Sequence, residues 1–101
     1  MPRTRLVWSA KAKENLRQIQ RYIGRDSPEA ARALIKQFKV AARRLKDFPE
    51  IGAVVEEKDD PEIREILVGS YRIIYRYRRP LVAIIEVRHG ARLLREEEFE
   101  E

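Results

Sequence analysis

The residues of this sequence best suited to chemistry stand close together near its end, in the stretch VRHGARLLR over residues 87–95. This stretch places the only histidine of the chain, His89, between Arg88 and Arg92. A histidine can act as a general acid or base near neutral pH, and guanidinium groups can stabilise charge on a transferring phosphoryl group. The combination would suit metal-free cleavage of RNA by the neighbouring 2′-hydroxyl. The alternative is that His89 is a packed or hydrogen-bonded residue at the end of a strand. This alternative is stronger on sequence grounds, because His89 alternates with Val87 onto the expected core side.

A second arginine-rich stretch, GSYRIIYRYRRP over residues 69–80, has the pattern of a strand with one exposed face. We expect Arg72 and Arg76 on that face, turned away from the helices that the sequence also predicts. In the expected register Arg72 lies across from Glu86, so one interpretation is a cross-strand ion pair on a solvated sheet. The other is a functional role, favoured for Arg72 because it stands beside a turn. The interleaved tyrosines could stack on bases, but they fall on the expected core face.

Composition disfavours several kinds of site. The chain has no cysteine and one histidine, which leaves no ligand set for a transition metal and no thiol nucleophile. Its four glycines are scattered and form no phosphate-binding loop. The longest apolar run, residues 81–85, is far too short to cross a bilayer, and the first residues contain no signal-peptide core. We therefore expect a cytoplasmic protein with no cofactor, no metal and no membrane partner.

The charge distribution favours a negatively charged partner. The 101 residues contain 22 Lys and Arg against 17 Asp and Glu, a net charge of +5. Five of those acids stand in the last six residues, so residues 1–95 hold 22 basic residues against 12 acidic ones, a net charge of +10. Such an excess is typical of proteins that bind a polyanion or an acidic protein, although a well-solvated surface has the same composition.

The elements that position these residues follow from the patterning. Arg3–Trp8 alternates and predicts an opening strand. Ser9 should cap a first helix that ends with Gly24 in a left-handed conformation. Ser27 should cap a second helix that stops before Pro49, and the short gap between the helices predicts an antiparallel hairpin. The apolar stripes expected to face a sheet are Ala12, Leu16, Ile19 and Ile23, then Ala31, Leu34, Ile35, Phe38, Ala41, Ala42 and Leu45.

The second half of the chain predicts two hairpins. Residues 50–61 look like a loop with a short edge strand at Ala53–Glu56. Strands are expected over Ile63–Val68, Tyr71–Tyr77 and Leu81–Arg88, joined by a two-residue turn and then a three-residue turn. The face expected to meet the helices is Ile66, Val68, Tyr71, Ile73, Tyr75, Leu81, Ala83, Ile85 and Val87. The opposite face is then Glu65, Leu67, Arg72, Ile74, Arg76, Val82, Ile84 and Glu86.

These elements predict one domain of the α+β class. An N-terminal strand and a helical hairpin would pack on one face of a small antiparallel sheet, over residues 1–95. Residues 96–101 would follow as an acidic C-terminal tail, which we expect to be disordered because its five glutamates repel one another.

Five strings in this order carry a resemblance that covers nearly the whole chain: WSAKAKENLRQIQRYI, DSPEAARALI, RLKDFPEIG, EILVGSYRIIYRY and VRHGAR. Together they resemble the RelE/ParE superfamily of type II toxin-antitoxin toxins. The resemblance implies a small basic α+β domain with a helical hairpin on an antiparallel sheet. It also implies a cognate antitoxin whose extended or helical C-terminal segment wraps the toxin, and operator DNA contacts that the antitoxin supplies.

Two activities divide this superfamily. RelE-like members cleave mRNA in the ribosomal A site, and ParE-like members poison DNA gyrase. Arg72 occupies the position of a RelE-type active-site arginine. However, Ile63 and Glu65 stand where the resemblance would lead us to expect a lysine pair, and Leu93 and Leu94 where it would supply a catalytic tyrosine. The strings VGSYRIIYR and HGAR look more ParE-like, so the resemblance favours gyrase as the target.

Three functions therefore stay open. The first is a ParE-like toxin without bond chemistry, whose candidate contacts with antitoxin or target are Arg64, Arg72, Arg76, Arg88 and Arg92. The second is a ribosome-dependent mRNA endonuclease, in which Arg72 and Arg92 hold the scissile phosphate and His89 serves as the acid. The third, a plain nucleic-acid-binding module, rests on charge alone.

Overall fold

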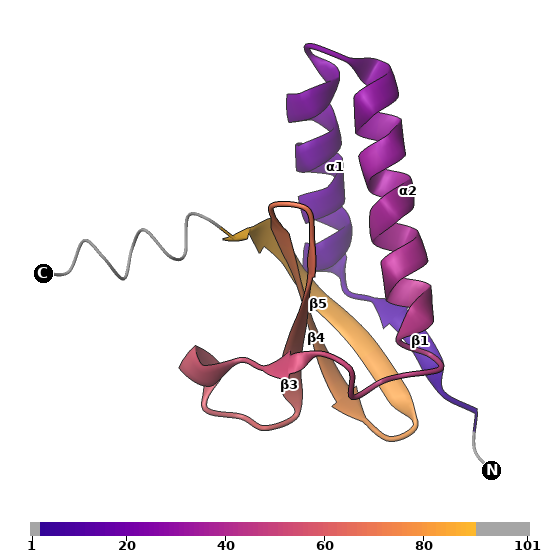
Figure 1. The fold of residues 1–101 in the computed structure, drawn as a ribbon, viewed down its shortest axis with the longest axis vertical. Coiled ribbons are helices and arrows are strands. Elements are labelled where there is room, and N and C mark those ends of the chain that lie inside the picture. The colour runs from indigo at the N-terminus through magenta and orange to yellow at the C-terminus, as the bar shows by residue number, and fades with distance from the viewer. Residues whose placement is uncertain (1–2, 91–101) are drawn as a thin grey trace, which may run out of the picture.

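The computed structural model describes residues 3–90, and within them a pair of helices covers one face of a five-stranded sheet (Figure 1). In chain order the elements are β1 (Arg5–Trp8), α1 (Ala10–Gly24), α2 (Pro28–Arg44), β2 (Ala53–Val54), the 3₁₀ turn η1 (Glu56–Lys58), β3 (Ile63–Val68), β4 (Tyr71–Arg78) and β5 (Leu81–His89). The strand order is β1-β5-β4-β3-β2, with β1 parallel to β5 and the other neighbours antiparallel. The predicted α+β fold is confirmed.

Both helices begin where the sequence predicts, because a serine caps each of them. The Ser9 hydroxyl accepts a 3.0 Å hydrogen bond from the backbone N–H of Ala12. The Ser27 hydroxyl accepts one of 3.1 Å from the N–H of Ala30, and Pro28 fits the first position of α2 because no hydrogen bond is required of its nitrogen. In the described part of the chain, neither helix is long and apolar enough to cross a membrane.

The first helix ends differently from the prediction. Gly24 does not adopt a left-handed conformation, and the residue after it, Arg25, keeps right-handed dihedrals (φ −59°, ψ −40°). The expected left-handed stop is therefore wrong. The connection between the helices ends α1 instead, because the backbone N–H groups of Asp26 and Ser27 both donate to the Ile23 carbonyl, at 3.2 and 3.1 Å.

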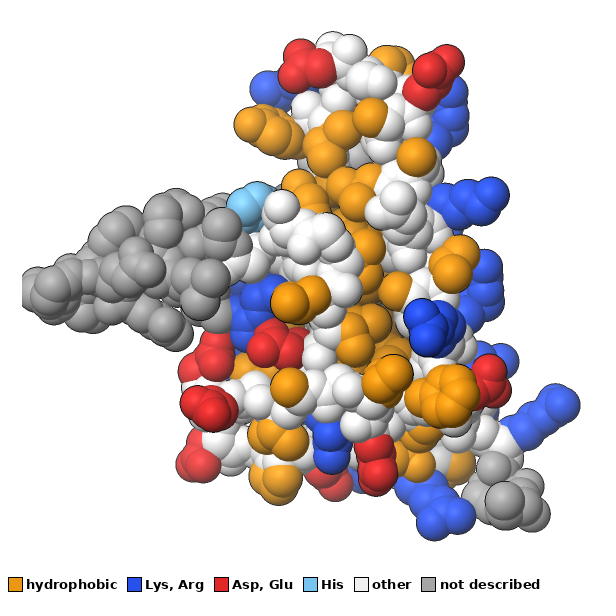
Figure 2. Space-filling model, viewed as in Figure 1, with side chains coloured by type: hydrophobic (Ala, Val, Ile, Leu, Met, Phe, Trp, Pro, Cys, Tyr) orange, Lys and Arg blue, Asp and Glu red, His pale blue; other side chains and the backbone are white. Residues whose placement is uncertain are grey.

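The main core lies between the helices and the sheet. Its buried members are Ala12, Leu16, Phe38, Ala42, Leu45, Ile73, Tyr75, Val82, Ile84 and Val87. A second, smaller cluster on the other face consists of Val55, Ile63 and Ile74, with Ile85 packed against it. Because β4 has a cluster on each side, its neighbouring residues Ile73 and Ile74 are both fully buried. Figure 2 shows further hydrophobic side chains in a band between the strands and α2.

The predicted register of the second hairpin is wrong in two compensating ways. The turn is one residue shorter than expected, because Arg78 already pairs with Leu81. Farther along, Tyr75 pairs with Ile84 and Ile74 with Glu86, which leaves Ile85 as an extra residue in β5.

The shorter turn exchanges the faces of residues 81–84, so Val82 and Ile84 join the main core instead of Leu81 and Ala83. The extra residue returns Val87 to the expected face, but every pair of residues beyond it is shifted by two positions from the predicted pairing.

A buried tyrosine fixes the loop that precedes β2. The Tyr75 hydroxyl donates to the Pro49 carbonyl at 2.8 Å and accepts from the Gly52 N–H at 3.0 Å. Arg64 reaches the same loop and donates to the carbonyls of Glu50 and Gly52, at 3.1 and 2.7 Å. The loop is therefore held to the sheet by side chains of β3 and β4.

Candidate functional site

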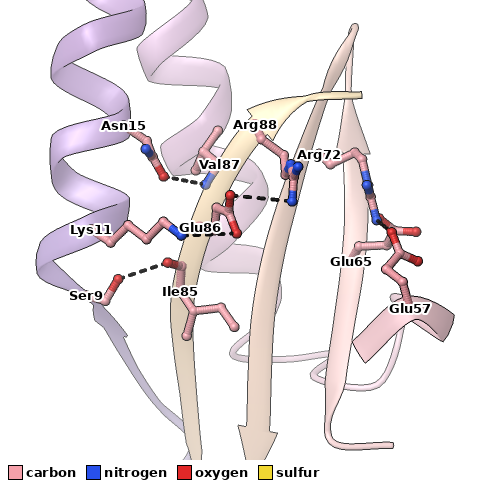
Figure 3. A network of polar contacts seen from close by, with 10 residues as sticks. All are labelled: Ser9, Lys11, Asn15, Glu57, Glu65, Arg72, Ile85, Glu86, Val87 and Arg88. Atoms are coloured by element: carbon pink, nitrogen blue, oxygen red, sulfur yellow. Dashed lines mark hydrogen bonds and ion pairs between the residues drawn. The ribbon is translucent and has the colours of Figure 1, made fainter. Parts of the chain in front are cut away.

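Among residues 3–90, Arg72 is the one buried charged residue, and it lies on the sheet face opposite the helices, as predicted (Figure 3). Only 6% of its surface is exposed. Its Nε donates to Glu65, and its Nη2 donates to Glu57 at 3.2 Å. Its Nη1 is buried without a hydrogen-bond partner among residues 3–90. The expected neighbour Glu86 is replaced by Arg88, because the register moves by two residues.

The other arginines of β4 also find carboxylates within the chain. Arg76 donates to Asp60 at 3.0 Å, and Arg78 donates to Glu62 at 2.9 Å. These acids, like Glu57, come from the segment between β2 and β3, where the expected edge strand stops early and the chain turns through η1 instead. The outer face of β4 is therefore largely neutralised by the chain itself. It is less cationic than the sequence predicts.

Sequence reasoning missed Glu57 because it belongs to a loop. The run EEKDD at residues 56–60 was the available signal, since a dense acidic run close in sequence to an arginine-rich strand can fold back onto it. The path of this acidic run could not be predicted from hydrophobic periodicity, because a segment outside helices and strands has no such pattern.

A second ion-pair group joins α1 to β5. Glu86 lies 3.6 Å from Lys11 and 3.6 Å from Arg88, and the Arg88 side chain stays 35% exposed. Nearby, the Asn15 side chain accepts a 3.0 Å hydrogen bond from the Val87 N–H, next to the extra residue in β5. Figure 3 shows these contacts side by side along the helix. They fix the position of α1 on the strand that carries His89.

His89 packs on the helix side of the sheet, as predicted. It pairs with Tyr71 across the strands, and the two rings meet edge to face with centroids 5.2 Å apart. Tyr71 in turn contacts Phe38 of α2 at 5.4 Å. Because successive strand residues point to opposite faces, His89 and Arg72 lie on different sides of the sheet. The third residue of the proposed catalytic set, Arg92, is outside the described residues.

Acidification is expected to weaken the ion pairs around η1. The pKa of Glu57 is held below its usual value of 4.5 by a hydrogen bond from its own backbone N–H and, against desolvation, by Arg72. The N–H of Glu62 and then Arg76 lower the pKa of Asp60 below 3.8. Both carboxylates have a lower pKa in the folded than in the unfolded state. The stabilisation that each contributes is therefore complete above the unfolded-state pKa and is lost as the pH falls through the folded-state pKa.

Urea midpoints measured from about pH 7 to about pH 3 should therefore fall below about pH 4.5, and fall less for Glu57→Gln than for the wild type. Parallel curves for the two proteins would contradict a contribution from Glu57.

The outer edge of β3 presents an apolar strand. β2 pairs only with Arg64 and Glu65, so Ile66–Val68 have no strand on their outer side within residues 3–90. Leu67 is 72% exposed on the sheet face away from the helices, and its neighbours pack partly against the main core. Unpaired backbone groups beside apolar side chains are suited to receive a further strand.

Comparison with known proteins identifies relatives along nearly the whole chain. The family model described as the ParE toxin of the type II toxin-antitoxin system parDE matches residues 6–94. The toxin RelE2 of Caulobacter vibrioides is 37% identical over 89 residues, which cover 87% of this chain and 97% of that protein. The putative toxin Y4kP of Sinorhizobium fredii is 32% identical over 92 residues, or 89% of this chain and 92% of that protein.

Two solved structures have the same fold. The chromosomal ParDE toxin-antitoxin system from P. aeruginosa matches with a TM-score of 0.70 and 19% identity, over 85% of this chain and 95% of that chain. The toxin-antitoxin complex RelBE2 from Mycobacterium tuberculosis matches with a TM-score of 0.59 and 20% identity, over 88% of this chain and 99% of that chain.

Proposed function

Because this chain belongs to the ParE toxin family of type II toxin-antitoxin systems, within the RelE/ParE superfamily, we propose that it inhibits DNA gyrase and is neutralised by a cognate antitoxin. Its role as a toxin of such a system follows from the family. The choice of gyrase as the target is the proposal.

The observation that supports this target is the separation of Arg72 from His89. An enzyme that cleaves RNA must place its general acid and the arginine that holds the phosphate at the same scissile bond. Here the two side chains leave opposite faces of the sheet, and Arg72 is engaged by Glu57 and Glu65. A toxin that acts by binding gyrase requires no such assembly, so this geometry fits it better.

The test is to assay gyrase supercoiling and cell-free translation with the same purified toxin. We expect loss of supercoiling that added antitoxin restores, intact mRNA in the translation reaction, and unchanged gyrase inhibition by His89→Ala. Cuts at defined codons of the mRNA that disappear in His89→Ala would overturn the proposal and establish the endonuclease.

That endonuclease is the second candidate, and two observations favour it. One is the 37% identity to a relative named RelE2. The other is that Arg72 and His89 each keep a buried nitrogen without a hydrogen-bond partner in the described chain. In this alternative Arg72 and Arg92 hold the scissile phosphate and His89 is the acid.

For the antitoxin, we infer that an extended segment adds to the free edge of β3. Main-chain hydrogen bonds would continue the sheet, and apolar side chains would cover Leu67 on one face and the α2 side on the other. The structural matches to a ParDE toxin-antitoxin system and to the toxin-antitoxin complex RelBE2 support an antitoxin as the partner. Operator DNA would be contacted through the antitoxin. The candidate arginine contacts remain Arg64, Arg72, Arg76, Arg88 and Arg92, and Arg76 and Arg88 are more accessible than Arg72.

Leu67→Asp is expected to weaken antitoxin binding by about 10- to 100-fold, because burial of a leucine side chain contributes about 1.5–3 kcal/mol. Isothermal titration calorimetry with the purified antitoxin measures this change. The matched control is Val7→Asp, a 40% exposed valine on β1 at the opposite end of the strand order. Equal weakening by both variants would argue against the β3 edge.

A further inference from the structure

The uncompensated positive charge of this chain lies on its helices, not on its sheet. Residues 10–45, which contain α1 and α2, hold ten Lys and Arg against three Asp and Glu. Residues 46–90, with β2 to β5, hold eight basic residues against nine acidic ones. In Figure 2 basic side chains project along the helices, and acidic ones gather at the lower left and also stand at the top of the hairpin. The helical hairpin is therefore the part of the chain suited to meet a polyanion.

Near the tip of this hairpin, four arginines line an open cleft of about 650 Å³. Arg17 and Arg21 of α1 and Arg25, the residue that caps its end, follow one another at four-residue spacing, which places them in a row about 6 Å apart in axial rise. Arg32 of α2 lines the other side. The cleft exists because the residues between the two rows are small: Gly24, Pro28 and Ala31.

Two of the four guanidinium groups are engaged and two are not. Glu14 accepts a hydrogen bond from Arg17 at 3.0 Å and lies 3.5 Å from Arg21. Across residues 3–90, neither Arg25 nor Arg32 has a carboxylate within ion-pair distance, although Asp26 and Glu29 stand close to them in sequence. Glu14 is therefore an internal competitor for any anion that enters the cleft.

We propose that this arginine cleft binds the phosphate backbone of a nucleic acid without regard to its sequence. Guanidinium groups match phosphate geometry with paired hydrogen bonds, and backbone contacts need no apolar pocket. An acidic peptide would bury large apolar anchors, and the cleft lining contains none. The proposal is independent of the toxin's target, since the residues that line the cleft belong to α1, α2 and their connection, and none of them belongs to β3 or β4.

The experiment measures binding of the full chain to a fluorescein-labelled 20-base-pair duplex DNA and to a single-stranded RNA of similar length, by anisotropy at several salt concentrations. About four phosphate contacts predict a slope of log K against log salt of about −3 to −4. Arg25→Gln with Arg32→Gln should reduce that slope by about 2 and weaken binding about tenfold. Glu14→Gln should strengthen binding severalfold, because it releases two guanidinium groups.

The controls remove equal charge elsewhere. Arg5→Gln with Arg79→Gln takes two exposed arginines from β1 and from the turn between β4 and β5, which Figure 1 shows at the end of the sheet opposite the hairpin tip, and Glu56→Gln matches the change at Glu14. Binding should change less than twofold in both. If both double arginine variants lost the same amount of affinity, the cleft would not be the binding site, and net charge alone would explain the binding. Tighter binding of a peptide with the sequence EEEFEE than of either nucleic acid, lost in the cleft variant, would overturn the choice of ligand.

Discussion

Glu65→Ala is expected to lower the free energy of unfolding by about 3 kcal/mol, because it leaves the buried Arg72 charge with Glu57 as its remaining ion-pair partner in the described chain. Removing one member of a buried pair is costly because the other charge stays desolvated. Urea unfolding at neutral pH, followed by circular dichroism, measures the change. A midpoint equal to that of the wild type would contradict a stabilising role of the pair.

The double variant Arg72→Met with Glu65→Leu separates stability from function. Replacing a buried ion pair by apolar side chains of similar volume is often neutral, so this protein should recover most of the lost stability. A growth assay without antitoxin then tests the guanidinium itself. If Arg72 contacts the target, the double variant is stable and non-toxic. A stable variant with full toxicity would limit Arg72 to a structural role.

Gly52→Ala is expected to destabilise the fold by about 3 kcal/mol. A Cβ at this position would lie 2.6 Å from the Glu65 carbonyl oxygen and 2.7 Å from the Tyr75 hydroxyl. The first of these atoms is backbone and cannot rotate away, and movement of the second would break the hydrogen bonds that Tyr75 makes to the loop. Thermal unfolding should show a lower midpoint.

Gly24→Ala is the matched control for this substitution. There the nearest atom to a new Cβ is that of Ala31 at 3.8 Å, an ordinary van der Waals contact, and the residue is helical. Alanine is favoured over glycine in a helix by about 0.8–1 kcal/mol, so this variant should be slightly more stable than the wild type. Destabilisation of both variants to the same extent would show that contacts at Gly52 are not the cause.

Local signals were sufficient to predict the two helices and the strands β1, β3, β4 and β5. Ser9 and Ser27-Pro28 mark both helix starts because capping depends on a few neighbouring atoms. The alternation around Gly69 marks the first hairpin for the same reason, and Gly69 adopts the positive φ that its turn requires. The face of β4 that carries Arg72 and Arg76 could also be predicted, because it depends only on the alternation of side chains along one strand.

Longer-range features could not be derived from local patterns. The extra residue Ile85 is apolar like residues 81–84 before it, so the apolar run does not show where the pairing of β5 slips by one residue. The neighbour of Arg72 was therefore mispredicted. Likewise, the acids that neutralise β4 come from a loop whose path depends on Tyr75 and Arg64, which are far from it in sequence.

The parallel pairing of β1 with β5 has a consequence for the synthesis of this protein. Residues 5–8 have no strand partner until residues 81–84 have been made, since their only ladder is with β5 among the described strands. Helices α1 and α2 can form early from local contacts, but the side of α1 that packs on β5 remains uncovered until that strand is made. We therefore expect the toxin fold to assemble only after β5 has been synthesised, and a chain released from a ribosome that stalls before β5 should not be toxic.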